Sequence, residues 1–120
     1  MSETFRSKEL NDKYLGLIKD GFHDSGCNLC KAPSIKEWDH WRVIDNLFPY
    51  DLIAKTHHML IPKKHAVEEE LTGEELAELK KLKQGHINEN YGWIMEAVPK
   101  IKSVPSHFHL HLINSKFDYE

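Results

Sequence analysis

Three histidines recur at every second position near the end of the sequence, in the segment Ser-His-Phe-His-Leu-His-Leu-Ile at residues 106–113. Alternate side chains of an extended strand point to opposite faces, so the imidazoles share one face and the apolar residues share the other. A strand that only needed a polar face would normally use Thr, Lys, Glu or Ser, and histidine has little preference for strands. We therefore interpret the histidine face as a chemical site and the apolar face as core. The three histidines are His107, His109 and His111.

This triplet of histidines suits chemistry at phosphorus. A neutral imidazole nitrogen is a good nucleophile near neutral pH, and the phosphoramidate that it forms is reactive enough to be cleared by water or another acceptor. Neighbouring imidazoles can donate hydrogen bonds to the phosphate oxygens in the transition state. Alternate strand residues stand roughly 7 Å apart at Cα, within reach of one phosphate. A zinc metalloprotein remains an alternative, because His-x-His on one strand also presents two metal ligands, and His57 or His65 would add a third.

The sequence holds two cysteines, spaced as Cys27-Asn28-Leu29-Cys30. Without other cysteines in the chain, such a pair is more typical of a metal knuckle or a redox pair than of a structural disulfide. A tetrahedral zinc site needs two further ligands from elsewhere in the chain. Two free thiols are the alternative.

Short elements are predicted on the N-terminal side of the triplet. Apolar residues between positions 10 and 18 fall on one helical face, and Gly21 is a suitable stop, so we expect an amphipathic helix. The patterns at 38–47 and 58–61 predict two strands. Together these two strands suggest an antiparallel pair.

The clearest helix start lies at Thr72. Thr72 has the residue type of an N-cap, and Glu75 has the type and spacing of its capping-box partner. We expect the helix to continue to about Asn88, although an internal glycine costs about 1 kcal/mol in a helix. The side chains expected along its inner face are Leu76, Leu79, the stem of Lys83, and Ile87.

A third strand is predicted at 91–98, and a linker bracketed by Pro99 and Pro105 leads to the histidine strand. The order strand, strand, helix, strand, strand, with short connections, is typical of an α+β fold, a mainly antiparallel sheet with flanking helices. A chain of 120 residues is long enough for one domain with a real core. We expect that domain to span 1–120, with 1–26 forming the N-terminal helix and a turn.

Composition and charge exclude several classes of protein. The sequence has 40% hydrophobic and 29% charged residues and a net charge of -3. The negative balance argues against non-specific nucleic-acid binding, and no DNA or RNA module is visible. No apolar run is long enough to span a bilayer, and residues 1–6 lack the pattern of a signal peptide. We therefore predict a cytoplasmic protein that binds neither nucleic acid nor membrane.

The alternation of histidine and apolar residues at 107–113 resembles the signature of the histidine triad (HIT) family of nucleotide hydrolases and transferases. The segment 56–65, in which His precedes a short apolar strand that ends in Pro-Lys-Lys-His, is similar to the family's second block. The segment 46–50 looks like the one in which family members place a ribose-binding Asn or Asp. The resemblance covers most of the chain, from the cysteine pair to Ile113.

The resemblance implies attack on the α-phosphate of a nucleotide through a covalent nucleotidyl-histidine. At matching positions, His109 would be the nucleophile and Asn46 would bind the ribose. His57 and His111 would contact the α-phosphate. His58 would point the other way, because adjacent strand residues face opposite sides. The remaining histidines match no motif and are expected at the surface: His23, His40 and His86.

The resemblance also accounts for the cysteine pair. In zinc-bearing family members, a Cys-x-x-Cys pair is completed by the His that ends the second block and by the first His of the triad. This implies a structural Zn²⁺ held in a closed shell of two thiolates and two imidazoles. Family members are often two-fold dimers, so the resemblance leaves room for a homodimer. The four implied ligands are Cys27, Cys30, His65 and His107.

The segment before the triad departs from the family pattern. Many members have a Gly-Gln-Ser-Val-like approach that contributes a Ser or Gln to the phosphate and the leaving group, whereas this chain has Lys-Ser-Val-Pro-Ser at 102–106. Ser103 and Ser106 are the candidates for this phosphate contact, although neither aligns with the family's serine. A nucleotide-binding module without catalysis is therefore a further alternative.

Overall fold

The computed structural model describes residues 4–21, 26–102 and 104–117. Its strands are β1 (Ser34–Glu37), β2 (Trp41–Asp45), β3 (Ala54–Pro62), β4 (Trp93–Met95) and β5 (Leu110–Ser115). They form one sheet in the order β1-β2-β3-β5-β4, and every neighbouring pair is antiparallel. The predicted α+β fold with an antiparallel sheet is confirmed.

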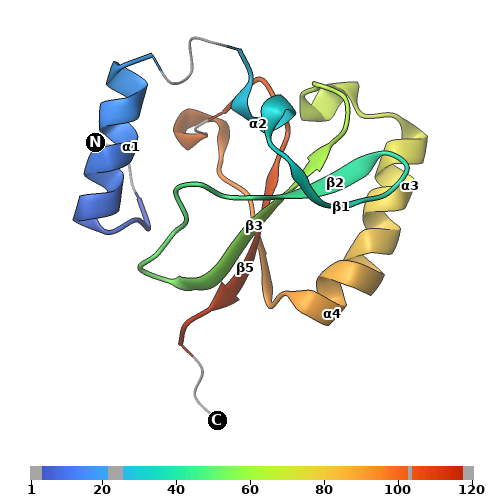
Figure 1. The fold of residues 1–120 in the computed structure, drawn as a ribbon. Helices are drawn as coiled ribbons and strands as arrows, with labels where there is room; N and C mark the ends of the chain where they lie inside the picture. Colours follow the sequence, from blue (N-terminus) through green and yellow to red (C-terminus); the bar gives the residue numbers. More distant parts are fainter. Residues whose placement is uncertain (1–3, 22–25, 103, 118–120) are drawn as a thin grey trace.

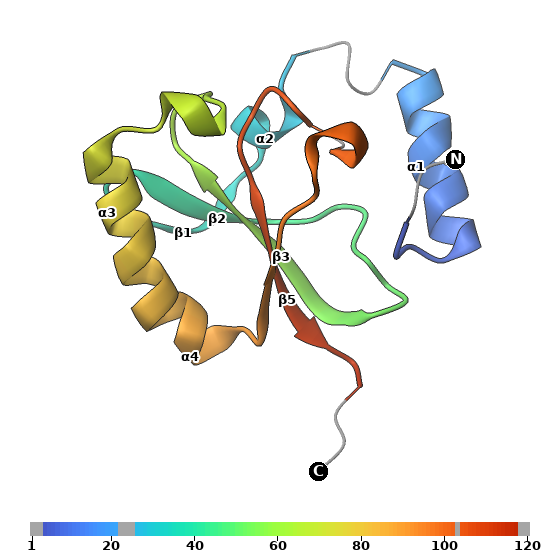
Figure 2. The same cartoon turned by 180° about the vertical axis from the view of Figure 1, so that it is seen from behind.

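Helices lie on both sides of this sheet (Figure 1). In that view and in the view from behind (Figure 2), α1 and α3 stand on opposite sides of the crossed strands β3 and β5. Within the described ranges, no helix is long and apolar enough to cross a membrane. The α-helices are α1 (Lys8–Lys19), α2 (Asn28–Lys31), α3 (Gly73–Leu82) and α4 (Asn88–Asn90), with 3-10 turns at Glu68–Glu70 and Pro99–Ile101 and a π-helical turn at Lys83–Ile87.

The larger core cluster lies between α3 and the sheet. Leu79 and Leu82 pack there, and the indole N–H of Trp41 donates to the carbonyl oxygen of Glu75 at 2.8 Å. The apolar residues that alternate with the triad histidines belong to this cluster, as predicted. The buried members are Trp41, Val43, Leu60, Leu79, Leu82, Ile87, Phe108, Leu110 and Leu112.

Helix α3 begins with the predicted capping box. The N–H of Glu75 donates to Thr72 Oγ1 at 3.1 Å, and the N–H of Thr72 donates to Glu75 Oε1 at 2.8 Å. The predicted inner face is partly wrong, because Leu76 is 48% exposed. Glu75 is buried in its place, since its carboxylate is satisfied by Thr72 and by Lys64 Nζ at 2.8 Å. A paired carboxylate can therefore occupy a position that periodicity assigns to an apolar side chain.

The strand predicted at 38–47 is too long, and β1 is missed. Residues 38–40 form the turn of a hairpin, in which the N–H of Trp38 donates to the carbonyl oxygen of Trp41 at 2.9 Å. Every residue of β1 is exposed, so the strand lacks the alternation that reveals a half-buried strand. The pairing of β2 with β3 is antiparallel, as predicted.

The other observed strand boundaries also differ from the predicted ones. β3 starts at Ala54 rather than 58, and β4 spans three residues rather than 91–98. β5 starts at Leu110, so His107 and His109 precede the strand, and the backbone bends at His107. The triad therefore straddles the beginning of β5.

The N-terminal helix forms as predicted but buries little of its apolar face. Ser7 caps α1 by accepting a hydrogen bond from the N–H of Leu10 at 3.3 Å. Tyr14 is the buried residue of this helix, whereas Leu17 and Ile18 are 41% and 37% exposed. The helix contacts the rest of the fold mainly through Tyr14, whose ring lies 5.2 Å from that of Phe48.

Candidate active site and metal centre

His57 and His111 lie side by side on the face of the sheet away from α3. His57 Nε2 lies 2.8 Å from His111 Nδ1, and the backbone N–H of Tyr50 donates to His57 Nδ1 at 3.0 Å. Because His57 Nδ1 is an acceptor, its Nε2 carries the proton and donates to His111 Nδ1. His111 then carries its own proton on Nε2.

Tyr50 covers this pair of histidines. Its ring centroid lies 4.5 Å from that of His57 and 5.0 Å from that of His111. Its hydroxyl lies 3.4 Å from His111 Nε2, which is long for a hydrogen bond. The Nε2–H of His111 is therefore only weakly engaged by the protein.

His109 presents one nitrogen for attack. Its Nδ1 lies 2.9 Å from the carbonyl oxygen of His107, and only a protonated Nδ1 can make this hydrogen bond. Nε2 therefore keeps its lone pair. The rings of His109 and His111 are nearly perpendicular, with centroids 5.2 Å apart. A nucleophilic nitrogen and a hydrogen-bond donor are thus placed next to each other.

Burial keeps these imidazoles neutral. His57 and His111 are 4% and 3% exposed. Burial is the main cause that lowers the pKa of His57 to about 4, and the charges of Arg6 and His58 add to it. Burial likewise lowers the pKa of His111 to about 3, with further contributions from neighbouring positive groups. Burial also lowers the pKa of His109, so near neutral pH these rings are in the form that can attack or donate without charge.

A cavity of about 80 Å³ opens beside His109. Among the four buried histidines of the described chain, His109 is the one that lines this cavity. Asn46 also lines it, with Oδ1 accepting from the N–H of Phe48 at 2.8 Å. Apolar walls with a few polar groups are typical of a small-molecule site. The apolar part of the lining includes Leu29, Ile44, Leu47, Met59 and Val104.

Ser106, the one predicted serine contact that the structure describes, does not line this cavity. Ser106 is exposed and lines a separate hollow beside Cys27 and His65. Ser103 and His23 lie outside the described residues. The approach to the triad instead contains a lysine whose charge acts on His109.

That lysine is Lys102, whose side chain is only 15% exposed. Its Nζ lies 3.9 Å from Glu96 Oε2 and 5.7 Å from the ring centroid of Phe108. The charge of Lys102 lowers the pKa of His109, and the charge of Glu96 raises it. The two charges therefore have opposite effects on the pKa of His109.

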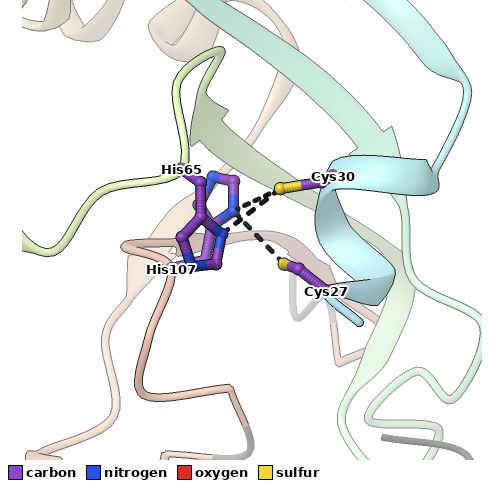
Figure 3. A group of neighbouring side chains, drawn as sticks. All are labelled: Cys27, Cys30, His65 and His107. Atoms are coloured by element: carbon purple, nitrogen blue, oxygen red, sulfur yellow. Dashed lines mark hydrogen bonds between the residues drawn. The ribbon is translucent and has the colours of Figure 1, made fainter. Parts of the chain in front are cut away.

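The four predicted metal ligands form a second cluster (Figure 3). Cys30 Sγ lies 3.3 Å from His65 Nδ1 and 3.4 Å from His107 Nδ1, and Cys27 Sγ lies 3.4 Å from the same His107 nitrogen. All four ligand atoms lie within 4.8 Å of one another. In a tetrahedral site with zinc bonds of about 2.3 Å to sulfur and about 2.0 Å to nitrogen, sulfur and nitrogen stand roughly 3.5 Å apart. The cluster fits that donor set.

Hydrogen bonds prepare this cluster for a metal. His107 Nε2 donates to the carbonyl oxygen of Pro62 at 3.1 Å, which leaves Nδ1 unprotonated and facing the thiols. Arg42, which is 8% exposed, donates to the carbonyl oxygens of Leu29 and Ala32 at 2.6 and 2.5 Å. The guanidinium thereby fastens the cysteine segment to β2.

The sequence analysis assigned no role to two residues of these sites, Tyr50 and Arg42. A lone arginine inside the apolar run of β2 was a usable signal, because a buried guanidinium must find several acceptors. Tyr50 ends the segment 46–50, but that motif pointed only to Asn46. His58 faces the other side of β3, as predicted, and its Nδ1 lies 2.6 Å from the hydroxyl of Tyr91. His40 and His86 lie outside both clusters and are partly buried rather than fully exposed.

Similar solved structures include histidine triad proteins. A HIT family hydrolase from Legionella pneumophila is 25% identical, with a TM-score of 0.51 over 74% of this chain and 92% of its own. A HIT family hydrolase from Clostridium thermocellum is 19% identical, with a TM-score of 0.53 over 79% of this chain and 96% of its own. A hypothetical protein from Leishmania major is 21% identical, with a TM-score of 0.61 over 80% of this chain and 77% of its own.

No protein-family model matches the sequence, and no curated protein sequence matches it. The similarity to solved structures concerns the fold, and it agrees with the resemblance indicated by the motifs at 46–50, 56–65 and 107–113. The chain has the fold of the histidine triad proteins.

Proposed function

We propose that the chain is a histidine triad nucleotide hydrolase or nucleotidyl transferase that acts at the α-phosphate. The observation that carries the proposal is the state of His109, whose Nδ1–H donates to a carbonyl while its side chain lines the cavity. The apolar walls suit a nucleobase, and the amide of Asn46 suits a ribose hydroxyl. The fold shared with HIT family hydrolases supports the same assignment.

The reaction would proceed by two displacements at phosphorus. First, the lone pair of His109 Nε2 bonds to the α-phosphorus, and the bond to the leaving group breaks. The leaving group departs with that electron pair and takes a proton from water. The Nδ1–H bond to the His107 carbonyl stays in place and stabilises the positive charge on the ring.

In the second displacement, water or a phosphate acceptor attacks the same phosphorus. The acceptor loses its proton to solvent, the P–N bond breaks, and the electron pair returns to His109 Nε2. Hydrolysis gives a nucleoside monophosphate, and transfer to phosphate gives a nucleoside diphosphate. The choice of acceptor separates a hydrolase from a transferase.

His111 and His57 have different roles in this proposal. The weakly engaged Nε2–H of His111 donates to a phosphate oxygen as negative charge develops there. The donor of His57 is directed at His111 Nδ1, so His57 acts on the phosphate through the tautomer and orientation of His111.

Cys27, Cys30, His65 and His107 would hold Zn²⁺ in a structural site. Four protein ligands close the coordination shell, so the metal would supply stability rather than a reactive water. In the described chain, His109 and His111 lie outside this ligand group, which favours phosphate chemistry over a triad that binds metal. The link to His107 would also fix the carbonyl that accepts from His109.

Turnover of a small nucleotide panel tests the proposal. The panel contains a nucleoside phosphoramidate, a dinucleoside polyphosphate and a nucleoside diphosphate sugar, each with water or phosphate as acceptor. We expect release of a nucleotide by the wild type and by His40→Ala, which alters a histidine outside the site, and none by His109→Ala. Equal rates in His109→Ala and wild type would reject the proposal.

A nucleotide-binding module without catalysis is the second candidate. It is favoured by Ser106, which lines a different hollow from the cavity that His109 lines. It predicts that nucleotides bind while no member of the panel is turned over. Turnover that depends on His109 would exclude it.

A further inference from the structure

We infer that Arg6 is a phosphate-binding residue of this site, recognising the charged phosphate of the nucleotide from the N-terminal segment. The inference rests on the proposed function and adds the cation that the neutral histidines do not supply. None of the sequence motifs includes Arg6, because it stands far from them in the chain.

Arg6 is held in place by contacts at its own side chain. Its Nε donates to the carbonyl oxygen of Phe48 at 2.7 Å. The guanidinium carbon lies 4.4 Å from the ring centroid of Tyr14 and 5.2 Å from that of Tyr50. A guanidinium packed on two aromatic rings keeps its charge and its plane in a defined orientation.

The backbone around Arg6 is fixed as well. The N–H and the hydroxyl of Ser7 both donate to the Asp51 carboxylate at 2.6 Å, and the N–H of Leu52 donates to the carbonyl oxygen of Phe5 at 3.0 Å. The segment that carries Arg6 is therefore fastened to the loop that carries Tyr50. Arg6 is positioned before any ligand arrives.

Arg6 borders the space next to the nucleophile. It lines the cavity that His109 and Asn46 also line. It also lines a neighbouring groove of about 290 Å³ that Tyr50 and Glu96 border. If a nucleotide occupied the first cavity and extended into the groove, its phosphates would lie beside Arg6.

The guanidinium of Arg6 has N–H groups that no other residue of the described chain uses and that can donate to a phosphate. Within residues 4–21, 26–102 and 104–117, no carboxylate forms an ion pair with Arg6, and the one hydrogen bond of its side chain uses Nε. Both amino groups of the guanidinium therefore remain available, and they are the donors that grip a phosphate in a bidentate manner. The charge of Arg6 already reaches the site, since it contributes to the lowered pKa of His57 and of His111.

The substrate chemistry requires such a group. A nucleotide brings at least one negative charge to the α-phosphate, and more charge develops as the leaving group departs. His57, His109 and His111 are neutral near neutral pH and offer no compensating charge. Arg6 supplies that charge, while Lys102 is already paired with Glu96.

Calorimetric titration with adenosine and guanosine and with their 5′-monophosphates tests the inference. The comparison of nucleoside with nucleotide isolates the phosphate. We expect Arg6→Gln to weaken binding of the monophosphate by about 10- to 100-fold, because charged hydrogen bonds contribute about 1.5–3 kcal/mol, and to leave nucleoside binding unchanged. Arg6→Lys keeps the positive charge but loses the paired amino groups of the guanidinium. Its affinity for the monophosphate should fall between those of Arg6→Gln and wild type.

Two control variants separate binding from structure. Lys8→Gln removes the same charge from an exposed side chain paired with Asp12 and should match the wild type. Ser7→Ala loosens the segment that positions Arg6 but keeps the guanidinium, so it should weaken monophosphate binding less than Arg6→Gln does.

The outcomes are distinguishable. If Arg6→Gln weakens nucleoside and monophosphate equally, or neither, the inference about Arg6 is overturned while the proposed function stands. If the wild type binds none of the four compounds, the proposed function is overturned and the inference falls with it.

Discussion

His57 Nε2 lies 2.8 Å from His111 Nδ1 across the paired strands β3 and β5. The proton in that hydrogen bond belongs to His57, because the Tyr50 N–H occupies its other ring nitrogen. His111 must then present an N–H at Nε2. One backbone amide thus sets the tautomers of two histidines and places the proton of His111 on Nε2, the nitrogen proposed to donate to a phosphate oxygen.

Replacing His111 by Ala should lower kcat by about 10²- to 10³-fold, the usual cost of losing one transition-state donor. The KM should change less, because the contact strengthens as charge develops. Steady-state kinetics on the best substrate of the panel give both values. His58→Ala is the matched control, since His58 faces the other side of β3 towards Tyr91. A kcat for His111→Ala within about twofold of the control would contradict the role of His111.

Acidification should destabilise the fold before the carboxylates titrate. The pKa values of His57 and His111 are about 4 and about 3 in the folded chain, below the ordinary value of about 6.5. The unfolded chain therefore binds more protons as the pH falls below about 6.5, and the free energy of unfolding should fall by on the order of a few kcal/mol by pH 4. Urea unfolding between about pH 6.5 and pH 5 measures the slope. His57→Gln should make the slope of unfolding free energy against pH smaller. An unchanged slope in that variant would refute the lowered pKa of His57.

Chelation of the metal should destabilise the protein. Without the ion, two thiolates and two imidazoles lose a shared partner, and the link between α2 and the start of β5 is lost. We expect one zinc per chain by elemental analysis and a Tm lower by about 5–10 °C after chelation. Cys30→Ser should abolish the response, whereas His40→Ala should retain it. If the purified protein contains no stoichiometric zinc and its Tm is unchanged by the chelator, the metal site is rejected and the two cysteines are free thiols.

Arg42 should control metal affinity without touching the metal. Arg42→Met removes the donors to the Leu29 and Ala32 carbonyls, so the cysteine segment loses its preferred position. We expect zinc affinity, measured by competition with a chromophoric chelator, to fall by about 10- to 100-fold. Arg42→Lys should recover part of the loss, because one ammonium satisfies fewer carbonyls than a guanidinium. Equal affinities for wild type and Arg42→Met would show that the segment is ordered by other contacts.

The periodic parts of the fold could be predicted from the sequence. The period-two histidines, the capping box at Thr72 and the Cys-x-x-Cys spacing are local patterns, and each one reports a local geometry. The structure places all four predicted metal ligands together and puts Asn46 and His109 on one cavity. The grouping of His65 and His107 with the cysteines, and of Asn46 with His109, was implied by the resemblance to the histidine triad family rather than by local spacing.

The remaining features depend on contacts between distant residues. Arg6 and the Phe48 carbonyl are 42 positions apart, and Tyr50 and His111 are 61 positions apart. No local period encodes such pairs. The exposed strand β1 lacks an alternating pattern for the same reason, since it is formed by pairing with β2 rather than by burial of its own face.

The central claim is a covalent nucleotide on His109, and mass spectrometry of the trapped protein tests it most directly. The wild type is quenched with base shortly after mixing with a turned-over nucleotide, because a phosphoramidate is more stable in base than in acid, and is then digested and mapped. We predict one added nucleoside monophosphate on the peptide that contains 107–113, located on His109 and lost in His109→Ala. Turnover by the wild type with no adduct on that peptide, or an adduct that survives in His109→Ala, would contradict the account.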